Sequence, residues 1–179
     1  MIRHFDPHKM RFNEVGMEYV LGHSTIRQEY KRSSGVVNRK FDNKNTDLDV
    51  EVIGVMGEIA VGVLLRERLV RWFNDEITLC GDGGVVDLEG LDRSKIQVKA
   101  RARAHADPFI IFNSMDDFKA DYAVLAVRVD AATIDVAGWI DRGTFRVMYT
   151  RRDFGHGMRL TMKASELFLI EALLAALGG

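Results

Sequence analysis

Four polar side chains stand where the surrounding sequence gives no structural reason for their polarity. Glu58 lies inside an apolar segment with helical spacing, and Asp87 ends a short apolar run that predicts a strand. Gln97 and Lys99 are two positions apart in an alternating segment, so both point to the same face of the strand predicted there. Carboxylate and amide oxygens together are the ligands that hard cations such as Mg²⁺ or Mn²⁺ prefer.

These four residues predict a site for phosphoryl chemistry. A cation held by Glu58, Asp87 and Gln97 would stabilise charge on a pentavalent phosphorus and lower the pKa of a bound water. Lys99 beside it would orient that water and offset the developing charge, and would help to activate the water if its own pKa were depressed. We therefore take all four as candidate catalytic residues and the first three as candidate metal ligands.

The charge distribution surrounds this set with basic segments, although the chain as a whole has a net charge of −1. Residues 1–44 carry nine Lys/Arg against five Asp/Glu and residues 93–108 carry five against one, whereas residues 45–92 carry three against eleven. This pattern fits a phosphate-binding rim around a carboxylate cluster, and it fits segregated solvated faces equally. The candidate nucleic-acid contacts are Arg101, Arg103 and His105, with Lys31 and Arg32 of a basic N-terminal arm that also holds Arg3, Lys9, Arg11 and Arg27. Arg151-Arg152 is interpreted as a solvated pair.

The composition is that of a globular protein, with 47% apolar and 28% charged residues in a chain of 179. This length corresponds to one domain. The single cysteine, Cys80, excludes an internal disulfide framework and a multi-cysteine zinc site. No apolar run approaches the length of a membrane span and no secretory signal opens the sequence. We expect a cytoplasmic protein in a reducing environment, without membrane contact.

Hydrophobic periodicity predicts an α/β fold on a mixed sheet. Residues 11–32 have helix-like spacing with Val15, Tyr19, Val20, Ile26 and Tyr30 as inward positions, and residues 48–73 give the strongest helical pattern. Strands are predicted at 76–80, 85–88, 95–100, 109–112, 122–127 and 133–140, with an edge strand at 160–162. A short helix at 145–148 and a terminal helix at 165–177 complete the chain. We expect residues 1–46 to form a helical arm packed on a core of residues 47–179.

Three glycines interrupt the strongest helix around Glu58. Gly54, Gly57 and Gly62 each cost roughly 1 kcal/mol relative to alanine in a helix interior, so their presence needs a reason. A close approach of this helix to other backbone, with Glu58 held at the contact, is such a reason.

The order of these motifs resembles the PD-(D/E)XK nuclease superfamily. The residues that carry the resemblance are Gly57-Glu58, then Gly83-Gly84-Val85-Val86-Asp87, then Ile96-Gln97-Val98-Lys99. The resemblance implies a restriction-endonuclease-like mixed sheet flanked by helices and Mg²⁺-dependent cleavage of DNA. It makes Glu58 the helix acid, Asp87 the strand acid and Lys99 the motif lysine, while Gln97 replaces the usual Asp or Glu. Ala137-Gly138-Trp139-Ile140 is similar to a late strand of phage and mobile-element members.

Two other functions stay open at the level of the sequence. Gln97 would weaken metal binding, which leaves room for a catalytically weak or inactive relative that binds DNA or serves in an assembly. Alternatively, the glycine-rich helix serves tight packing in a structural or interaction domain, in which case Gly54→Ala or Gly57→Ala lowers stability. The sequence does not decide between internal and terminal cleavage or between DNA and RNA. Cutting both strands would be easiest for a homodimer.

Overall fold

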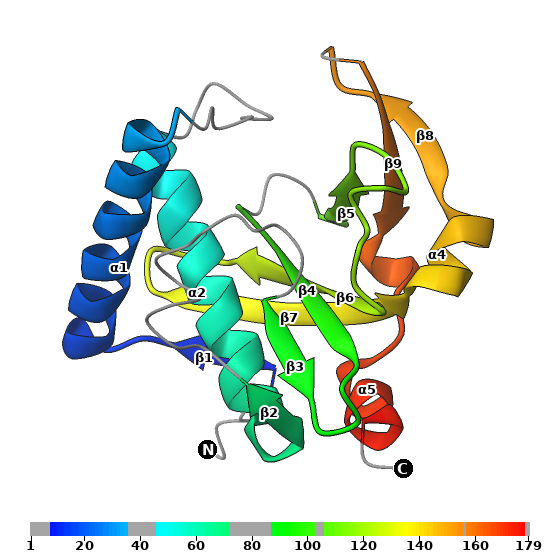
Figure 1. Ribbon diagram of the computed structural model, residues 1–179, viewed down its shortest axis with the longest axis horizontal. Helices are drawn as coiled ribbons and strands as arrows, with labels where there is room; N and C mark the ends of the chain where they lie inside the picture. The colour runs from blue at the N-terminus through cyan, green and yellow to red at the C-terminus, as the bar shows by residue number, and fades with distance from the viewer. Residues whose placement is uncertain (1–7, 36–45, 72–86, 103–105, 156, 178–179) are drawn as a thin grey trace.

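The computed structural model describes residues 8–35, 46–71, 87–102, 106–155 and 157–177. A six-stranded mixed sheet in the order β1-β7-β6-β4-β3-β2 forms its centre, and a three-stranded antiparallel sheet in the order β5-β9-β8 packs beside it (Figure 1). In the main sheet only β4 and β6 run parallel. The predicted α/β class with a mixed sheet is therefore confirmed.

The bounds of the elements are as follows. The main sheet contains β1 (Lys9–Arg11), β2 (Leu69–Arg71), β3 (Leu88–Gly90), β4 (Lys95–Ala102), β6 (Tyr122–Arg128) and β7 (Thr133–Asp141). The small sheet contains β5 (Phe109–Phe112), β8 (Thr150–Asp153) and β9 (Met158–Lys163). The helices are α1 (Glu14–Ser33), α2 (Asp47–Leu65), α4 (Arg142–Met148) and α5 (Ile170–Ala176), with 3₁₀ turns η1 (Arg66–Arg68) and η2 (Ala164–Glu166).

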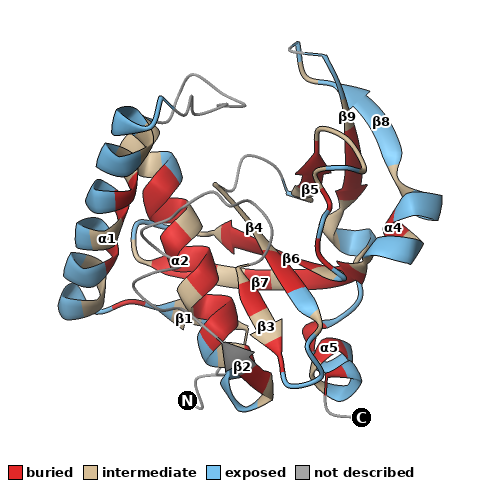
Figure 2. Ribbon diagram, viewed as in Figure 1, coloured by how far each residue is buried: buried red, intermediate tan, exposed pale blue. Residues whose placement is uncertain are grey.

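Two hydrophobic cores lie on opposite faces of the main sheet. One forms between α2 and the sheet and takes in Val124 and Ala126 of β6. The other forms between the sheet and the β5-β9-β8 layer with α4, and takes in Leu125 and Val127 of the same strand. The alternation along β6 follows from the two-residue period of a strand. Because α2 lies between α1 and the sheet, most of its residues are buried (Figure 2).

Helix α2 begins at a strong cap and ends earlier than the sequence indicated. Thr46 and Asp49 form a capping box, with the Thr46 side chain accepting from the Asp49 amide at 3.1 Å. The helix stops at Leu65 rather than near residue 73, because the apolar residues that follow η1 belong to β2, which pairs with β3. Apolar periodicity by itself does not distinguish the end of a buried helix from a buried strand.

Helix α1 is continuous, but it turns a different face inward than predicted. Its buried residues are Val20, Ser24 and Arg27. The prediction of inward positions was right for Val20 and wrong for four apolar side chains, which are 45–73% exposed: Val15, Tyr19, Ile26 and Tyr30. The reason is the partner: α1 packs on α2 through the ion pairs Arg27–Glu58 and Lys31–Glu51, and these pairs fix its rotation.

The predicted close approach of the glycine-rich helix is confirmed at one glycine. A Cβ placed on Gly57 would lie 2.6 Å from the Ala100 Cβ on β4 and 3.2 Å from the Ala126 Cβ on β6. Around Gly54 the space is more open, since the nearest atom would be Arg27 Nη1 at 3.9 Å. Gly57 thus allows α2 to press onto the two parallel strands and sets the height of its neighbour Glu58 above the sheet.

The C-terminal part differs from its prediction in two places. The strand around residues 160–162 is not an edge: β9 is central in its sheet, between β5 and the unpredicted β8. The terminal helix begins only at Ile170, because Phe168 forms a bridge with Trp139 and the Trp139 indole donates to the Leu169 carbonyl at 2.9 Å. These contacts hold the chain extended between η2 and α5, so the single helix predicted from residue 165 is divided.

Strands β4, β5, β6 and β7 lie close to their predicted positions, whereas α4 begins at Arg142, three residues before the helix predicted at 145–148. Strand β3 extends to Gly90, two residues beyond the end predicted for the strand at 85–88, because Glu89 pairs with β4 and Gly90 pairs with β2. The expected strand at 76–80 and residues 85–86 lie outside the described residues. The N-terminal segment contributes β1 to the main sheet as well as α1, since Lys9–Arg11 pairs with β7. Within the described part of the chain, no helix combines the length and apolarity needed to cross a bilayer.

Candidate functional site

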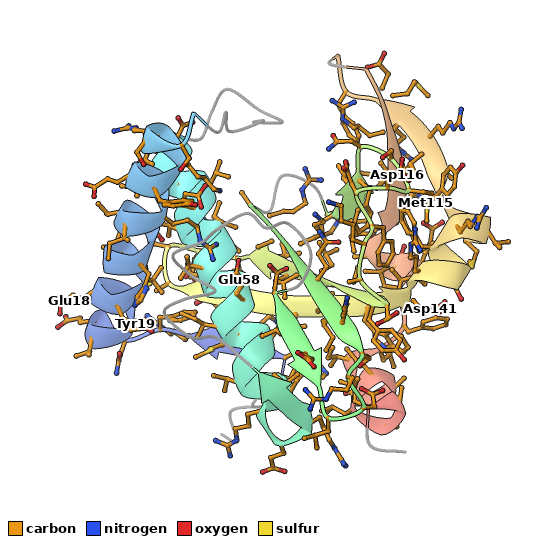
Figure 3. The ribbon with its side chains drawn as sticks, in the orientation of Figure 1. Glu18, Tyr19, Glu58, Met115, Asp116 and Asp141 are labelled. Atoms are coloured by element: carbon orange, nitrogen blue, oxygen red, sulfur yellow. The ribbon has the colours of Figure 1, made fainter. Side chains whose placement is uncertain are left out.

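Three of the polar residues singled out in the sequence lie on or beside β4, and the fourth, Glu58, lies on α2. The residues Val98 and Ala100 of this strand pack toward the core beneath α2, whereas Lys99 lies over Phe112 on the other face of the sheet. Asp87, directly before β3, stands beside β4 and interacts electrostatically with both Glu58 and Lys99. Figure 3 shows Glu58 on the part of α2 that crosses the sheet.

Glu58 is held by an arginine that the sequence analysis placed in the basic N-terminal arm. Arg27 Nη1 and Nη2 donate to the two oxygens of Glu58 at 2.9 and 2.8 Å. Both residues are buried, with 6% of Arg27 and 9% of Glu58 exposed. Burial opposes the charge on Arg27, but the hydrogen bonds and charge of Glu58, together with Glu51 and Asp87, raise its pKa. Arg27 is therefore part of the site rather than of the surface.

Asp87 takes over a hydrogen bond of the strand ladder. Its Oδ2 accepts from the Val98 backbone amide at 2.6 Å, just beyond the point where β3 pairs with β4. Burial, followed by repulsion from Glu58, raises the pKa of Asp87 to about 7, and the Val98 bond, Lys99 and Arg27 only partly offset this rise. A carboxyl group with a pKa near neutrality is a common property of functional sites.

Gln97 and Lys99 touch each other on the face opposite α2. With the Gln97 amide oriented to satisfy both neighbours, its oxygen accepts from Lys99 Nζ at 3.0 Å and its nitrogen donates to the Asp117 carbonyl at 3.2 Å. Lys99 Nζ lies 4.9 Å from the centroid of the Phe112 ring. Burial lowers the pKa of Lys99, and the charges of Asp87 and Asp117 counteract this only in part. Asp117 lies in a turn and carries no signal in the sequence.

The predicted nucleic-acid contacts differ in burial and in their hydrogen-bond partners. Lys31 is partly buried and pairs with Glu51 at 2.6 Å, whereas Arg32 at the end of α1 is exposed. Arg101 continues the face of Lys99 along β4 and donates to the Phe109 carbonyl at 3.3 Å. Arg103 and His105 lie outside the described residues. Lys31, Arg32, Arg101, Arg103 and His105 therefore stay predictions as phosphate contacts.

A basic ribbon formed by β8 and β9 contains Arg152, for which the sequence predicts a place in a solvated pair, and Arg159, for which the sequence makes no prediction. Arg152 on β8 stands directly opposite Arg159 on β9. The Arg152 guanidinium lies 4.5 Å from the centroid of the Phe109 ring, and the carbonyl of Phe109 is the acceptor for Arg101. Directly opposed like charges destabilise a strand pair, and a bound anion would relieve this repulsion. In Figure 1 the ribbon extends away from the main sheet.

The donor set suits a hard divalent cation in its chemistry, since Glu58, Asp87 and Gln97 all offer oxygen. Most of these oxygens already have donors, however. Arg27 binds both oxygens of Glu58, and Lys99 donates to Gln97. Within the described ranges, no group of three or more His, Cys, Asp or Glu side chains could hold a metal ion. A cation would thus rely on two carboxylates and an amide, and at Glu58 it would compete with the Arg27 guanidinium.

Comparison with known proteins does not add to this description. A scan against protein-family models gives no match, and a search of curated proteins finds no significant relative. A functional assignment therefore depends on the residues and geometry of the site.

Proposed function

We propose that the protein is a metal-dependent nuclease that hydrolyses phosphodiester bonds in DNA, with the restriction-endonuclease-like fold that its resemblance to the PD-(D/E)XK superfamily implies. The observation that carries the proposal is the position of Asp87 at the start of β3, where its charge interacts with both Glu58 of α2 and Lys99 of β4. Burying several charges together is costly and does not favour folding by itself. A catalytic role accounts for a cluster that packing does not require.

The layout of the elements also supports this proposal. A helix, α2, is followed by the antiparallel strands β2, β3 and β4 and then by β6, which runs parallel to β4. A mixed sheet flanked by helices is the architecture that the resemblance implies. Glu58 lies on α2 and Lys99 on β4, and this is the chain order of the helix acid and the motif lysine that the resemblance implies.

Each residue has a role in the proposed reaction. Glu58 and Asp87, with the Gln97 oxygen, would hold Mg²⁺ or Mn²⁺, which supplies charge stabilisation at phosphorus and a water of lowered pKa. Lys99 orients the attacking water, and burial lowers the pKa of its ammonium group, which eases proton exchange with that water. Gln97 also positions Lys99, because its amide bridges Nζ and the Asp117 carbonyl. Before a cation binds, Asp87 has a pKa of about 7 and therefore ionises near neutral pH.

DNA would reach the site along basic residues on the same side of the molecule. Arg101 lies one strand repeat beyond Lys99, and Phe109 links it to Arg152 of the ribbon. Arginines of this kind contact phosphates and position the backbone without reading sequence. Cleavage of both strands would be served by a homodimer, and sedimentation equilibrium of the full chain tests for one.

A cleavage assay tests the proposal directly. Supercoiled, linear and single-stranded DNA are incubated with Mg²⁺ or Mn²⁺ and the wild type, Asp87→Ala, Lys99→Ala or Lys95→Ala. Lys95 lies on the same strand but is exposed, so Lys95→Ala is the matched control. We expect metal-dependent cutting by the wild type and the control and its loss in the other two. Intact cleavage by Lys99→Ala would refute the role of the lysine.

A second candidate function is DNA binding without catalysis. Two observations favour it. Gln97 has a neutral amide where the resemblance implies an acidic metal ligand, and Arg27 neutralises the charge of Glu58. In this case the wild type retains DNA in a shift assay, cuts none of the three substrates and binds no Mn²⁺ at millimolar concentration. The same set of samples therefore separates the two functions.

A further inference from the structure

Arg27 is a charged neighbour of Glu58 to which the proposed reaction gives no task. We propose that Arg27 is a built-in counter-ion that competes with the divalent cation for Glu58 and yields it when the cation binds. This inference rests on the proposed metal-dependent function, since it concerns the same carboxylate.

The geometry leaves the cation no unoccupied oxygen on Glu58. The planar guanidinium donates to both oxygens at once, at 2.9 and 2.8 Å, in a site where both residues are buried. Paired donation of this kind is among the stronger hydrogen-bonding arrangements in proteins. A cation at Glu58 would therefore compete with the guanidinium for the charge and the lone pairs of the same two oxygens.

The position of Arg27 favours a role beyond joining α1 to α2. Lys31, one turn further along α1, already makes a buried ion pair with Glu51 of α2 at 2.6 Å. Arg27 differs from Lys31 because its charge also reaches Asp87, the second predicted ligand. Without a cation, Glu58 and Asp87 repel each other, and Arg27 supplies the positive charge that holds the two carboxylates together.

Gly54, one turn before Glu58 on α2, presents no side chain to the Arg27 guanidinium. A Cβ on Gly54 would have Arg27 Nη1 as its nearest neighbour, at 3.9 Å, so this turn of α2 does not clamp the arginine. When a metal cation takes the place of Arg27 at Glu58, the buried carboxylate keeps a positively charged partner. Removal of Arg27 without a replacement would leave this carboxylate without a counter-ion. Arg27 thus keeps the site assembled when no metal is bound, and it lowers the affinity for metal.

Mn²⁺ binding to the full chain, measured without DNA by calorimetry and by the paramagnetic resonance of unbound Mn²⁺, tests the competition. We expect Arg27→Gln to bind Mn²⁺ at least tenfold more tightly than the wild type, a change of about 1.4 kcal/mol. Arg27→Lys should lie between them, since one ammonium can occupy one carboxylate oxygen while the other binds the metal. Lys31→Gln is the matched control, and it should leave the affinity for Mn²⁺ unchanged.

Thermal unfolding supplies a second measurement. Arg27→Gln leaves Glu58 buried without a counter-ion, so it should unfold at a lower temperature than the wild type and recover with Mn²⁺. A ligand stabilises the folded state in proportion to the logarithm of its concentration over Kd, so Mn²⁺ should raise the melting temperature of Arg27→Gln more than that of the wild type. If Arg27→Gln does not fold, the affinity of Arg27→Lys decides the question.

The outcomes separate this inference from the proposed function. Equal Mn²⁺ affinity in the wild type and the Arg27 variants would overturn the competition and leave the metal-dependent function intact. Absence of Mn²⁺ binding in every variant at millimolar concentration would overturn both. Tighter binding in Lys31→Gln as well would show that loosening α1, rather than freeing Glu58, controls the affinity, and would also overturn the inference.

Discussion

Gly57→Ala tests whether the contact between α2 and the sheet positions the site. The added Cβ would lie 2.6 Å from the Ala100 Cβ, whereas ordinary contacts of this kind begin near 3.4 Å, so α2 must move by about 0.8 Å. Neither Ala100 nor Ala126 can rotate away, because a Cβ is fixed by its own backbone. The displacement therefore passes to the helix and to Glu58, the next residue along it.

The structure gives the sign and size of the effect. Overpacking of a close contact costs about 1–3 kcal/mol, and replacing a helical glycine by alanine returns about 1 kcal/mol. Gly57→Ala should then be net destabilising by about 1 kcal/mol. Gly54→Ala is the matched control, since its nearest contact is an ordinary 3.9 Å, and it should be stabilising by up to about 1 kcal/mol. The alternative in which the glycine-rich helix serves only tight packing predicts instead that Gly54→Ala or Gly57→Ala lowers stability.

Thermal and urea unfolding of the two variants beside the wild type provide the measurement. A difference of about 2 kcal/mol between them corresponds to roughly 4–8 °C in melting temperature for a chain of this length. Gly57→Ala should also lower the Mn²⁺ affinity and the cleavage rate, because it shifts Glu58 relative to Asp87. If Gly57→Ala is as stable as Gly54→Ala, the close approach of α2 to β4 is not as described and the reasoning fails.

Three further predictions follow from charges in the structure. The folded-state pKa of Asp87, about 7, lies above its ordinary value of 3.8, so the folded protein binds more protons between these values. The free energy of unfolding, measured by urea titration, should therefore fall as the pH rises toward and through 7. Asp87→Asn should flatten this dependence on pH. An unchanged dependence in Asp87→Asn would contradict the raised pKa of Asp87. Lys31→Met leaves Glu51 buried and unpaired, so it should cost about 3–5 kcal/mol, and Lys31→Met with Glu51→Met should recover most of it. A loss of under 1 kcal/mol in the single variant, again by urea unfolding, would show that the pair is not buried as described. Arg152→Ala should reduce the slope of log K against log salt for DNA binding by about 0.9 in metal-free anisotropy titrations, whereas Arg66→Ala, exposed on η1, should not. Equal slopes in both variants would exclude the ribbon as a phosphate contact.

Local patterns in the sequence were enough to predict the frame of the site. The two-residue period of β4 places Gln97 and Lys99 on one face, and the structure has them in contact. The glycine beside Glu58 predicted a close helix contact, which Gly57 makes with two strands. These predictions succeed because each depends on residues only a few positions apart, whose relative directions the backbone geometry fixes.

Features that depend on a distant partner could not be read in this way. The apolar spacing of α1 predicted that Tyr19 and Ile26 face inward, but the acids of α2 draw Arg27 and Lys31 inward instead. The helix predicted through residue 73 ends at Leu65, because the following residues pair with β3. In both cases an interaction between segments outweighs a local preference.

The sequence by itself determined the residue types of the site, their order and the mixed α/β frame. Only the tertiary structure decided their charge state and partners. Arg27 and Glu58 are 31 positions apart, and no local period relates them. The raised pKa of Asp87 likewise arises from burial and from Glu58 on another element. Electrostatic energies depend on distance in space and on exclusion of water, and both are set when the helices and strands pack together.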